Sequence, residues 1–471
     1  MKLRVLIAFL GVLSLSAPAY AKKAPHPSEL EFPPLKFEIP KTERVVLGNG
    51  MVLHLMEDHE LPIIQVSAKV RIGGAWEPSD KIGLASLTGS VWRSGGVQSM
   101  PPEELDEKLE FLGASVETGI SGKGGSVSLS VLKKDIDTGL EIFADVIKNP
   151  AFDKSRFDVA KNRMIEGIRR QNDEPNGIVG REFSKTILPN HPFGRSPTME
   201  SVKSIVREDT IRFYKDHVGP ESFIVGISGD FDSKDMIERF EKLFADFKPA
   251  KKKFAQIPNT PDNVENPGFY VVDKKIPQSA LRLGNIGVSR KNPDYFAVRV
   301  MNFVLGGGGF SSRLMQEIRS NRGLAYSVWS YFMGGENQRG LFMIGGETKA
   351  ETTAEFIEVA RGIMREVIEK GVTEKELVLA KQSIVNRFIF GFDNTAKVVS
   401  QYVWVEYHGL PKSWLEYFRT GIQKVTMKDV KRAAEKYLHP DAMVMLIVGD
   451  KPVFEKEIAK AGPITVLKLD N

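Results

Sequence analysis

The histidines of this sequence are not spaced to hold a metal ion. A helix can bind zinc through two imidazoles on one face, as in H-E-x-x-H or H-x-x-E-H, whose glutamate acts as general base. His54 and His59 are five residues apart, which is poor helical spacing and puts the rings on opposite faces of a strand. We therefore expect no histidine-based zinc site and interpret all seven histidines as surface or packing residues. They are His26, His54, His59, His191, His217, His408 and His439.

Other residue types exclude further chemistry. The absence of cysteine excludes disulfides, thiolate metal sites, a cysteine nucleophile and an acylated-cysteine anchor. The glycine run Gly306–Gly309 lacks the Lys-Ser/Thr ending of a phosphate-binding loop. With 65 basic and 60 acidic residues, a net charge of +5 and no long basic run, the composition does not indicate nucleic acid as a partner.

The N-terminus has the pattern of an export signal. Lys2 and Arg4 precede an apolar stretch over residues 5–15, and Ala19-Tyr20-Ala21 follows as a cleavage site. We predict a signal peptide over residues 1–21; an uncleaved N-terminal helix is the alternative. No later segment has transmembrane length without charge, so we expect an exported protein with no membrane insertion after cleavage. The bacterial periplasm is the expected compartment, and eukaryotic secretion is left open.

The chain repeats itself once. Residues 209–230 align with residues 429–450 without a gap, at an offset of 220 (429 − 209 = 220). Pro220 matches Pro440, and each copy ends in Gly-Asp. A constant offset over such a stretch predicts a duplicated domain of about 200 residues. The predicted boundaries are 22–41 for an extended lead-in, 42–248 for the first domain, 249–267 for a linker and 268–471 for the second domain.

Each half mixes strands and helices. Asn49-Gly50 between two apolar runs predicts a hairpin, and alternation at Val127, Leu129 and Val131 predicts a half-buried strand. Helical patterns fill residues 154–171 and 352–370. The predicted fold class is therefore α+β, with two duplicated domains, each a largely antiparallel sheet covered by helices.

The most distinctive stretch begins at the glycine run. It reads LGGGGFSSRL over residues 305–314, followed by EIRSNRGLAYS over residues 317–327. Supporting pieces are Gly73-Gly74 with Glu77, His191-Pro192-Phe193-Gly194-Arg195, and the Gly-Asp that ends each half. Over residues 42–460 the chain resembles the pitrilysin/insulinase metallopeptidase family, especially its two-domain bacterial members and the mitochondrial processing peptidase subunits.

The resemblance points to a lost metal site. Active relatives carry H-x-x-E-H on a helix of the first domain, and a more distant glutamate completes the zinc site. Ser86 and Ser90 stand here at the two histidine positions, Gly89 at the general base and Gly167 at the distal glutamate. Serine hydroxyls are poor zinc ligands and glycine offers no side chain. The resemblance thus implies a family member that binds no cofactor itself and is inactive alone.

A second group of residues retains the family pattern. In relatives, an arginine and a tyrosine seven residues apart reach a zinc site and stabilise the developing oxyanion; they map to Arg319 and Tyr326 (326 − 319 = 7). A guanidinium and a phenol are suitable donors for this role. From spacing alone they would be a surface charge and a strand residue. Gly306, Gly307, Gly308 and Gly309 match either a substrate-handling loop or an ordinary turn.

These features support three hypotheses. The first is a non-catalytic subunit of a heterodimeric zinc peptidase, whose partner is an active homologue that carries the zinc and whose substrate is a peptide. The second is a stand-alone peptide-binding or scaffold protein, which would take up an extended peptide at a sheet edge. The third is a metalloenzyme with substitute ligands, for which His54, His59 and Glu166 are the candidates.

Overall fold

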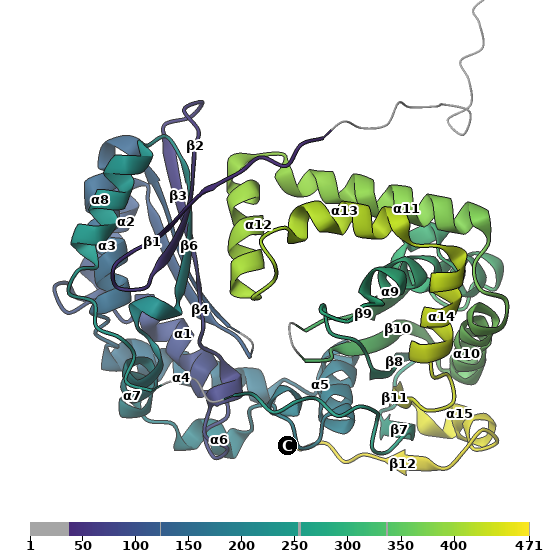
Figure 1. Ribbon diagram of the computed structural model, residues 1–471. Helices are drawn as coiled ribbons and strands as arrows, with labels where there is room; N and C mark the ends of the chain where they lie inside the picture. Colours follow the sequence, from purple (N-terminus) through teal and green to yellow (C-terminus); the bar gives the residue numbers. More distant parts are fainter. Residues whose placement is uncertain (1–36, 123, 253–255, 336–337, 471) are drawn as a thin grey trace, which may run out of the picture. The chain divides into compact units, whose positions relative to one another are not determined.

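The computed structural model describes residues 37–122, 124–252, 256–335 and 338–470. The described residues from 39 to 470 form one compact unit with two six-stranded sheets (Figure 1). The predicted signal peptide and most of the predicted lead-in lie outside the described residues. Among these residues, no helix has the length and apolar character needed to cross a bilayer.

The first sheet is built entirely from the first half of the chain. In spatial order it comprises β1 (Glu43–Val46), β2 (Val52–Glu57), β6 (Phe223–Gly229), β3 (Ile63–Val70), β5 (Gly125–Leu132) and β4 (Ser115–Ile120). Only the β2–β6 pairing is parallel. The helices of this half are α1 (Leu84–Ser94), α2 (Pro102–Leu112), α3 (Ile136–Lys148), α4 (Lys154–Arg169), α5 (Pro175–Ile187), α6 (Met199–Ser204), α7 (Arg207–His217) and α8 (Ser233–Leu243).

The second sheet has the same order apart from one edge strand. It comprises β12 (Ile464–Val466), β7 (Gly268–Asp273), β11 (Val444–Gly449), β8 (Gln278–Ile286), β10 (Leu341–Lys349) and β9 (Val328–Phe332). Its helices are α9 (Tyr295–Asn302), α10 (Thr353–Lys370), α11 (Glu374–Ile389), α12 (Thr395–Tyr407), α13 (Trp414–Lys424), α14 (Met427–Tyr437) and α15 (Lys451–Ile458). Two π-helical segments, η6 (Phe303–Gly307) and η8 (Met315–Asn321), follow α9.

The duplication predicted from sequence is present in the fold. Helices α4, α5 and α7 begin 220 residues before α11, α12 and α14, and β6 and β11 end 220 residues apart at Gly229 and Gly449. Three of the five pairings in the second sheet are antiparallel, as are four of the five in the first. The predicted α+β class, with two duplicated and largely antiparallel sheets covered by helices, is confirmed.

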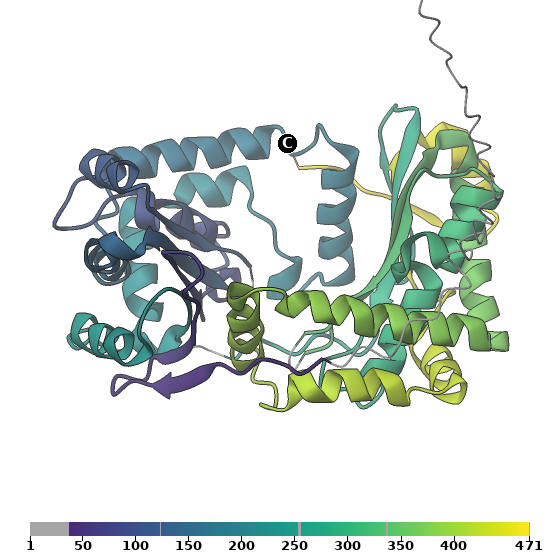
Figure 2. The same ribbon diagram turned by 90° about the horizontal axis from the view of Figure 1, so that it is seen from above.

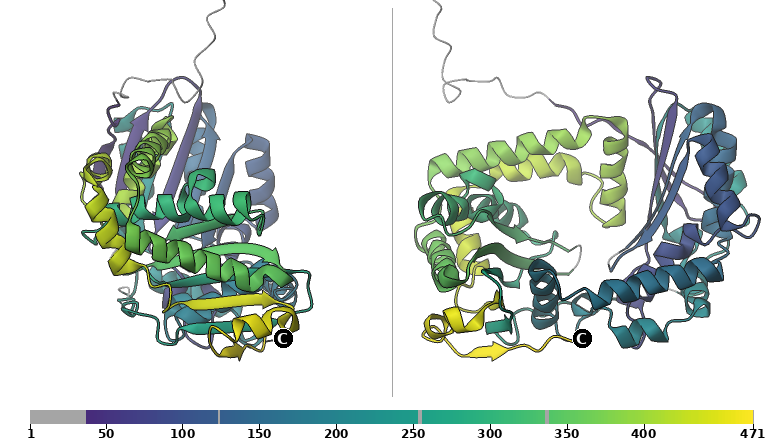
Figure 3. Two further views of the ribbon diagram at one scale, coloured as in Figure 1. Left: turned by 90° about the vertical axis from the view of Figure 1, so that its right-hand side faces the viewer. Right: turned by 180° about the vertical axis from the view of Figure 1, so that it is seen from behind.

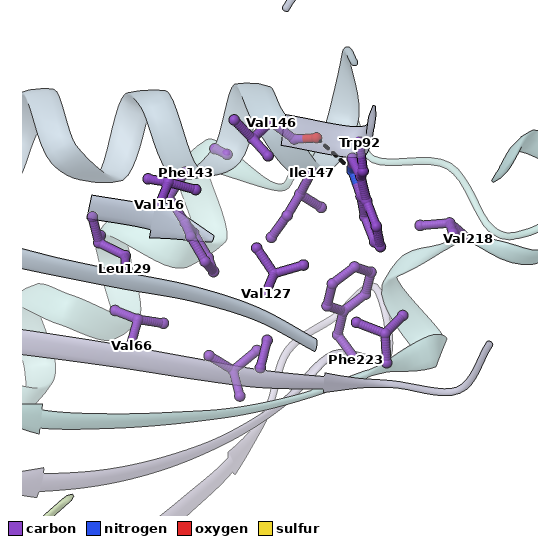
Figure 4. Close-up of a cluster of buried hydrophobic side chains, with 14 of the residues drawn as sticks. Val66, Trp92, Val116, Val127, Leu129, Phe143, Val146, Ile147, Val218 and Phe223 are labelled. Atoms are coloured by element: carbon purple, nitrogen blue, oxygen red, sulfur yellow. Dashed lines mark hydrogen bonds between the residues drawn. The ribbon is translucent and has the colours of Figure 1, made fainter. Parts of the chain in front are cut away.

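Helix α1 is anchored in the core of the first half. Trp92, on α1, is fully buried, and its indole N–H donates to the carbonyl of Val146 (2.8 Å), as Figure 4 shows. Val127, Val116 and Phe143 surround the same cluster from the strands and from α3 (Figure 4). Burial of so many branched and aromatic side chains, each worth about 1.5–3 kcal/mol, fixes the position of α1 relative to the sheet.

Each half contributes one helix that packs on the sheet of the other half. Helix α5 belongs to the first half in sequence but packs on β8 and β11, whereas α12 of the second half packs on β2, β3 and β6. The views in Figures 1, 2 and 3 show both helices on the sheet of the opposite half. Glycines in the two sheets allow these helices to pack closely. A Cβ at Gly226 would lie 2.4 Å from Val399 of α12, and one at Gly284 would lie 2.9 Å from Phe183 of α5.

Polar contacts also hold α12 against the first sheet. Arg44 of β1 donates two hydrogen bonds to the carboxylate of Glu406 on α12, each 2.9 Å long. Beside this pair, the buried ring of His54 contacts the hydroxyl of Thr42 (3.0 Å) and stacks on Tyr402. Burial lowers the pKa of His54, so the ring favours its neutral form.

Candidate functional site

Helix α1, which carries three of the four degenerate metal positions, is fixed at its start by Glu77. The Glu77 carboxylate accepts hydrogen bonds from the backbone N–H groups of Gly83 (3.2 Å) and Ala85 (2.6 Å). Burial raises the pKa of Glu77, while these two bonds and the charge of Arg195 act in the opposite direction. Glu77, from a segment that carries the family resemblance, therefore helps to position α1.

The two histidine positions form part of a serine row. Ser86 and Ser90 are exposed on α1, one turn apart. Ser90 Oγ donates to the carbonyl of Ser86 (2.9 Å), and Ser94 Oγ donates to that of Ser90 (2.7 Å). The hydroxyls of Ser90 and Ser94 are thus directed back to the helix backbone, as serines in helices often are, and serine hydroxyls are poor ligands for a divalent cation.

Gly89, at the general-base position, is a packing residue. Helix α1 packs against the edge strand β4, and a Cβ at Gly89 would lie 2.2 Å from the backbone N of Ile120. Thr118 of β4 bridges the two elements, since its hydroxyl donates to the carbonyl of Gly89 (3.0 Å) and accepts from the backbone N–H of Arg93 (3.1 Å). No side chain, a glutamate included, fits at position 89 without a shift of α1 or β4.

Position 167 is open but carries no ligand. Gly167 is exposed on α4, and a Cβ there would meet no atom within 4 Å. The adjacent Glu166 is exposed and forms an ion pair with Arg169. The structure therefore leaves space for a distal ligand, but neither residue supplies one toward α1.

A basic cavity of about 350 Å³ lies between α1 and α4 and reaches Ser90. Arg156 and Arg163 line it together with apolar side chains of α4. Arg156 pairs with Glu103 (3.1 Å) and Asp106 (3.0 Å), whereas Arg163 has no hydrogen bond or ion pair within the part of the chain that the structure describes. The guanidinium of Arg163, unpaired among the described residues, opposes the binding of a divalent cation in this cavity. The residues present here do not fit zinc.

The substitute ligands of the third hypothesis do not form a cluster. The ring of His59 contacts Asp230 (2.6 Å), His54 is buried beneath α12, and Glu166 is paired on α4. Over residues 37–470, apart from the short gaps in the description, no group of three or more His, Asp or Glu side chains could hold a metal ion.

The structure brings the predicted Arg319 and Tyr326 together. Arg319 lies on η8, with its guanidinium carbon 4.5 Å from the ring centroid of Tyr326 and 4.6 Å from that of Phe310. Tyr326 is 83% exposed and Phe310 64% exposed, so the guanidinium is held between two aromatic rings at the surface. Cation–π contacts fix the plane of the group and leave its N–H donors free.

The glycine run has mainly packing roles. A Cβ at Gly306 would lie 2.7 Å from the backbone N of Ser330 on the edge strand β9, much as Gly89 contacts β4 in the first half. Gly307 and Gly308 are held equally close by Asn302 and Phe303. Gly309 has a positive φ of 59° and leads directly into Phe310. The run thus allows η6 to approach β9 and presents Phe310; its role in substrate handling stays a prediction.

Two family models match successive parts of the chain. The family model of insulinase (peptidase family M16) matches residues 54–200, and that of the peptidase M16 inactive domain matches residues 204–384. The chain belongs to the M16 peptidase family. Among the described residues no group of side chains could bind a metal ion, which is consistent with an inactive M16 member in a non-catalytic role.

M16 relatives cover most of the chain. It is 24% identical over 407 residues to the non-peptidase homolog YmxG of Helicobacter pylori, spanning 84% of this chain and 91% of that protein. It is 26% identical over 364 residues to an uncharacterized zinc protease of Streptomyces coelicolor, spanning 76% of this chain and 79% of the relative.

Solved M16 structures share the fold. The crystal structure of the peptidase M16 inactive domain from Pseudomonas fluorescens gives a TM-score of 0.78 at 27% identity, covering 87% of this chain and 98% of that one. The periplasmic protease PqqL of Escherichia coli gives a TM-score of 0.75 at 15% identity, covering 95% of this chain and 49% of that chain. The second likeness concerns the fold alone.

Sequence reasoning missed two features of this M16 site. Phe310 was not singled out, although its place directly after the glycine run was a usable signal. Arg163 was missed because a charge on the predicted helix 154–171 is indistinguishable from an ordinary solvated charge until α4 is packed on α1. Phe310 adds an aromatic contact to Arg319, and Arg163 adds a positive charge to the cavity that reaches Ser90.

Proposed function

We propose that this chain is the non-catalytic subunit of a heterodimeric M16 zinc peptidase. Its partner is an active homologue with an intact H-x-x-E-H motif, and the zinc resides in that partner. The substrate is an unfolded peptide, which the two subunits hold between them. This chain contributes Arg319 and Tyr326 to the partner's site.

One observation carries the proposal. The guanidinium of Arg319 lies against the rings of Phe310 and Tyr326, and it has no hydrogen bond or ion pair to any described residue. Nearby arginines are engaged: Arg322 pairs with Glu317 (2.7 Å), and Arg313 with Glu376 (2.7 Å). A guanidinium at the surface that contacts two rings but has no hydrogen-bond partner among the described residues supports a role toward a group outside this chain.

The chemistry of the pair suits a peptide carbonyl. The partner's zinc supplies an activated water for attack on the scissile carbonyl. The guanidinium N–H groups of Arg319 and the phenol O–H of Tyr326 donate to the carbonyl oxygen as it gains negative charge. Because the rings hold Arg319 before substrate binds, little reorganisation is needed at the moment of reaction.

Export is part of the proposal. Residues 1–21 have the pattern of a cleaved signal, and a periplasmic protease with the same fold supports the same compartment for this chain. The heterodimer would then act on peptides in the periplasm.

Co-expression with an M16 homologue that carries the zinc motif tests the proposal. Peptidase activity should require both chains and should fall about 10- to 1000-fold with Arg319→Ala or Tyr326→Phe, since an oxyanion donor is lost. Arg322→Ala is a matched control on the same segment, and Tyr417→Phe removes another exposed phenol; both should retain activity. Full activity of the partner alone, or indifference to Arg319→Ala in the complex, would refute the proposal.

The alternative is a stand-alone peptide-binding protein that uses a sheet edge. Helix α1 flanks β4, and α9 and η6 flank β9, so two of the four sheet edges are partly covered by helices. This observation favours the heterodimer over strand addition at those edges. A stable homodimer that binds peptides and forms no complex with any active M16 homologue would support the alternative.

A further inference from the structure

The second half contains a cavity at the place that corresponds to the degenerate metal position. In the first half, that position lies between α1 and α4. Helix α11 corresponds to α4 at the repeat offset of 220, and α9 with η6 precedes the edge strand β9 as α1 precedes β4. Between α9, η6 and α11 lies a cavity of about 210 Å³.

The floor of this cavity is aromatic. Phe388 of α11 stacks on Phe418 of α13, with ring centroids 4.9 Å apart and ring planes within 20°. Phe303 of η6 completes the floor, and Tyr331 of β9, 55% exposed, lines one side. A Cβ at Gly308 would lie 2.8 Å from the ring of Phe303, so the glycine run gives that ring its position. The floor suits one apolar or aromatic side chain.

The rim is cationic. Arg299 of α9 and Arg387 of α11 are exposed and line the cavity, and neither forms an ion pair or hydrogen bond with the residues that the structure describes. Asn302, which also lines the cavity, is already satisfied, because its amide donates to the carbonyl of Ser330 (3.1 Å) and accepts from the hydroxyl of Ser330 (2.8 Å). Among the described residues, no carboxylate lines the cavity. The free donors therefore select an anion.

We propose that this cavity binds the C-terminal residue of a peptide, with Arg299 and Arg387 holding the terminal carboxylate and the phenylalanines holding an aromatic or branched side chain. A carboxylate next to an apolar side chain matches the separation of the cavity into a cationic rim and an aromatic floor. The volume is below the 300–1,000 Å³ typical of sites for larger ligands, which suits a single residue. The inference rests on the proposed function only in taking a peptide as ligand.

Paired peptides test this assignment on the full chain without its signal peptide. Two hexapeptides of one sequence ending in Phe are compared by calorimetry, one with a free carboxylate and one with a terminal amide. The acid should bind about tenfold more tightly than the amide, because charge-assisted hydrogen bonds to two arginines are lost with the charge. N-acetylphenylalanine serves as a third ligand, which distinguishes a free aromatic acid from a peptide end.

Variants assign the effect to the cavity. Arg299→Gln with Arg387→Gln should remove the preference for the acid, and Phe388→Ala should weaken both peptides. Arg163→Gln is the matched control, since Arg163 is also exposed and unpaired among the described residues but lines the cavity of the first half. Equal affinity of acid and amide, or an unchanged preference in the double variant with a native circular dichroism spectrum, would overturn the inference. Tighter binding of N-acetylphenylalanine than of the peptide acid would also overturn it, in favour of a small aromatic acid as ligand.

The outcomes separate this inference from the proposed function. Acid-selective binding without activation of any M16 partner would leave the cavity assigned and refute the heterodimer. The opposite result is activation of a partner that depends on Arg319 but not on Arg299 or Arg387, together with equal binding of the acid and the amide. That result would support the heterodimer and refute the assignment of the cavity.

Discussion

Replacing Gly89 by alanine should destabilise the protein, although the same change favours most helices. A Cβ at position 89 would lie 2.2 Å from the backbone N of Ile120 and 2.9 Å from the backbone C of Gly119. Both atoms belong to a paired strand, so they cannot rotate away as a side chain would. Overpacking of this kind costs about 1–3 kcal/mol, and a backbone contact belongs at the upper end.

The net effect follows from two opposing terms. Alanine gains about 1 kcal/mol over glycine in a helix interior, so a clash of about 3 kcal/mol leaves a loss of about 2 kcal/mol for Gly89→Ala. Gly167→Ala is the matched control on α4, where a Cβ meets nothing within 4 Å. It should raise the free energy of unfolding by up to about 1 kcal/mol.

Urea unfolding measures both variants. Tryptophan fluorescence, to which the buried Trp92 on α1 contributes, gives one probe of unfolding, and circular dichroism gives a second. The unfolding midpoint should fall for Gly89→Ala and rise slightly for Gly167→Ala, with similar slopes. A midpoint for Gly89→Ala equal to or above that of the wild type would refute the close packing of α1 on β4. The same contact predicts that Gly89→Glu cannot restore a general base without disturbing β4.

Three further predictions concern pH, the seat of α12 and metal content. Burial opposes ionisation of Glu376, but hydrogen bonds from Arg313 and Thr373 lower its pKa from 4.5 to about 2. The Glu376 carboxylate should therefore contribute fully to the free energy of unfolding above pH 4.5, and this contribution should be lost as the pH falls toward 2. Glu376→Gln should cost about 1–2 kcal/mol at pH 7 and much less near pH 2, measured by urea unfolding at each pH; equal losses at both would contradict the assignment. Glu406→Gln, which breaks the double hydrogen bond with Arg44, should lower stability by about 1 kcal/mol in thermal unfolding, and an unchanged melting temperature would count against that contact. Elemental analysis should find no stoichiometric zinc in this chain alone and about one zinc in an active complex, whose activity a chelator removes; tight zinc in the isolated chain would revive the metalloenzyme hypothesis.

Local features of the fold were predictable because their causes are local. The alternation at Val127, Leu129 and Val131 depends only on neighbours along one strand, and these residues lie on β5 as predicted. The repeat offset of 220 is visible in the residues themselves, and it pairs the helices that correspond in the two halves. The exchange of α5 and α12 was not predictable, because the apolar face of an amphipathic helix does not specify which sheet it covers.

Some features of the candidate site were likewise predictable from the sequence, and others were not. Once the resemblance placed Ser86 and Ser90 at the two histidine positions, their residue types predicted that neither would hold zinc. The contacts of Arg319 with Phe310, and the role of Gly89 against β4, join segments that fold together only through tertiary packing. Such contacts leave no periodic signal in the sequence.

The exchange of α5 and α12 has a consequence for how the two halves can exist. Cut at the predicted linker and separated, each fragment would keep a helix with no sheet to cover and a sheet with strands bared to water, at Ile224 in one and at Leu446 in the other. The fragments would be expected to recombine in trans rather than persist as independent monomers. Any ancestor with a single copy of the repeat would have met the same need, and a symmetric dimer that traded these helices between two chains would have satisfied it.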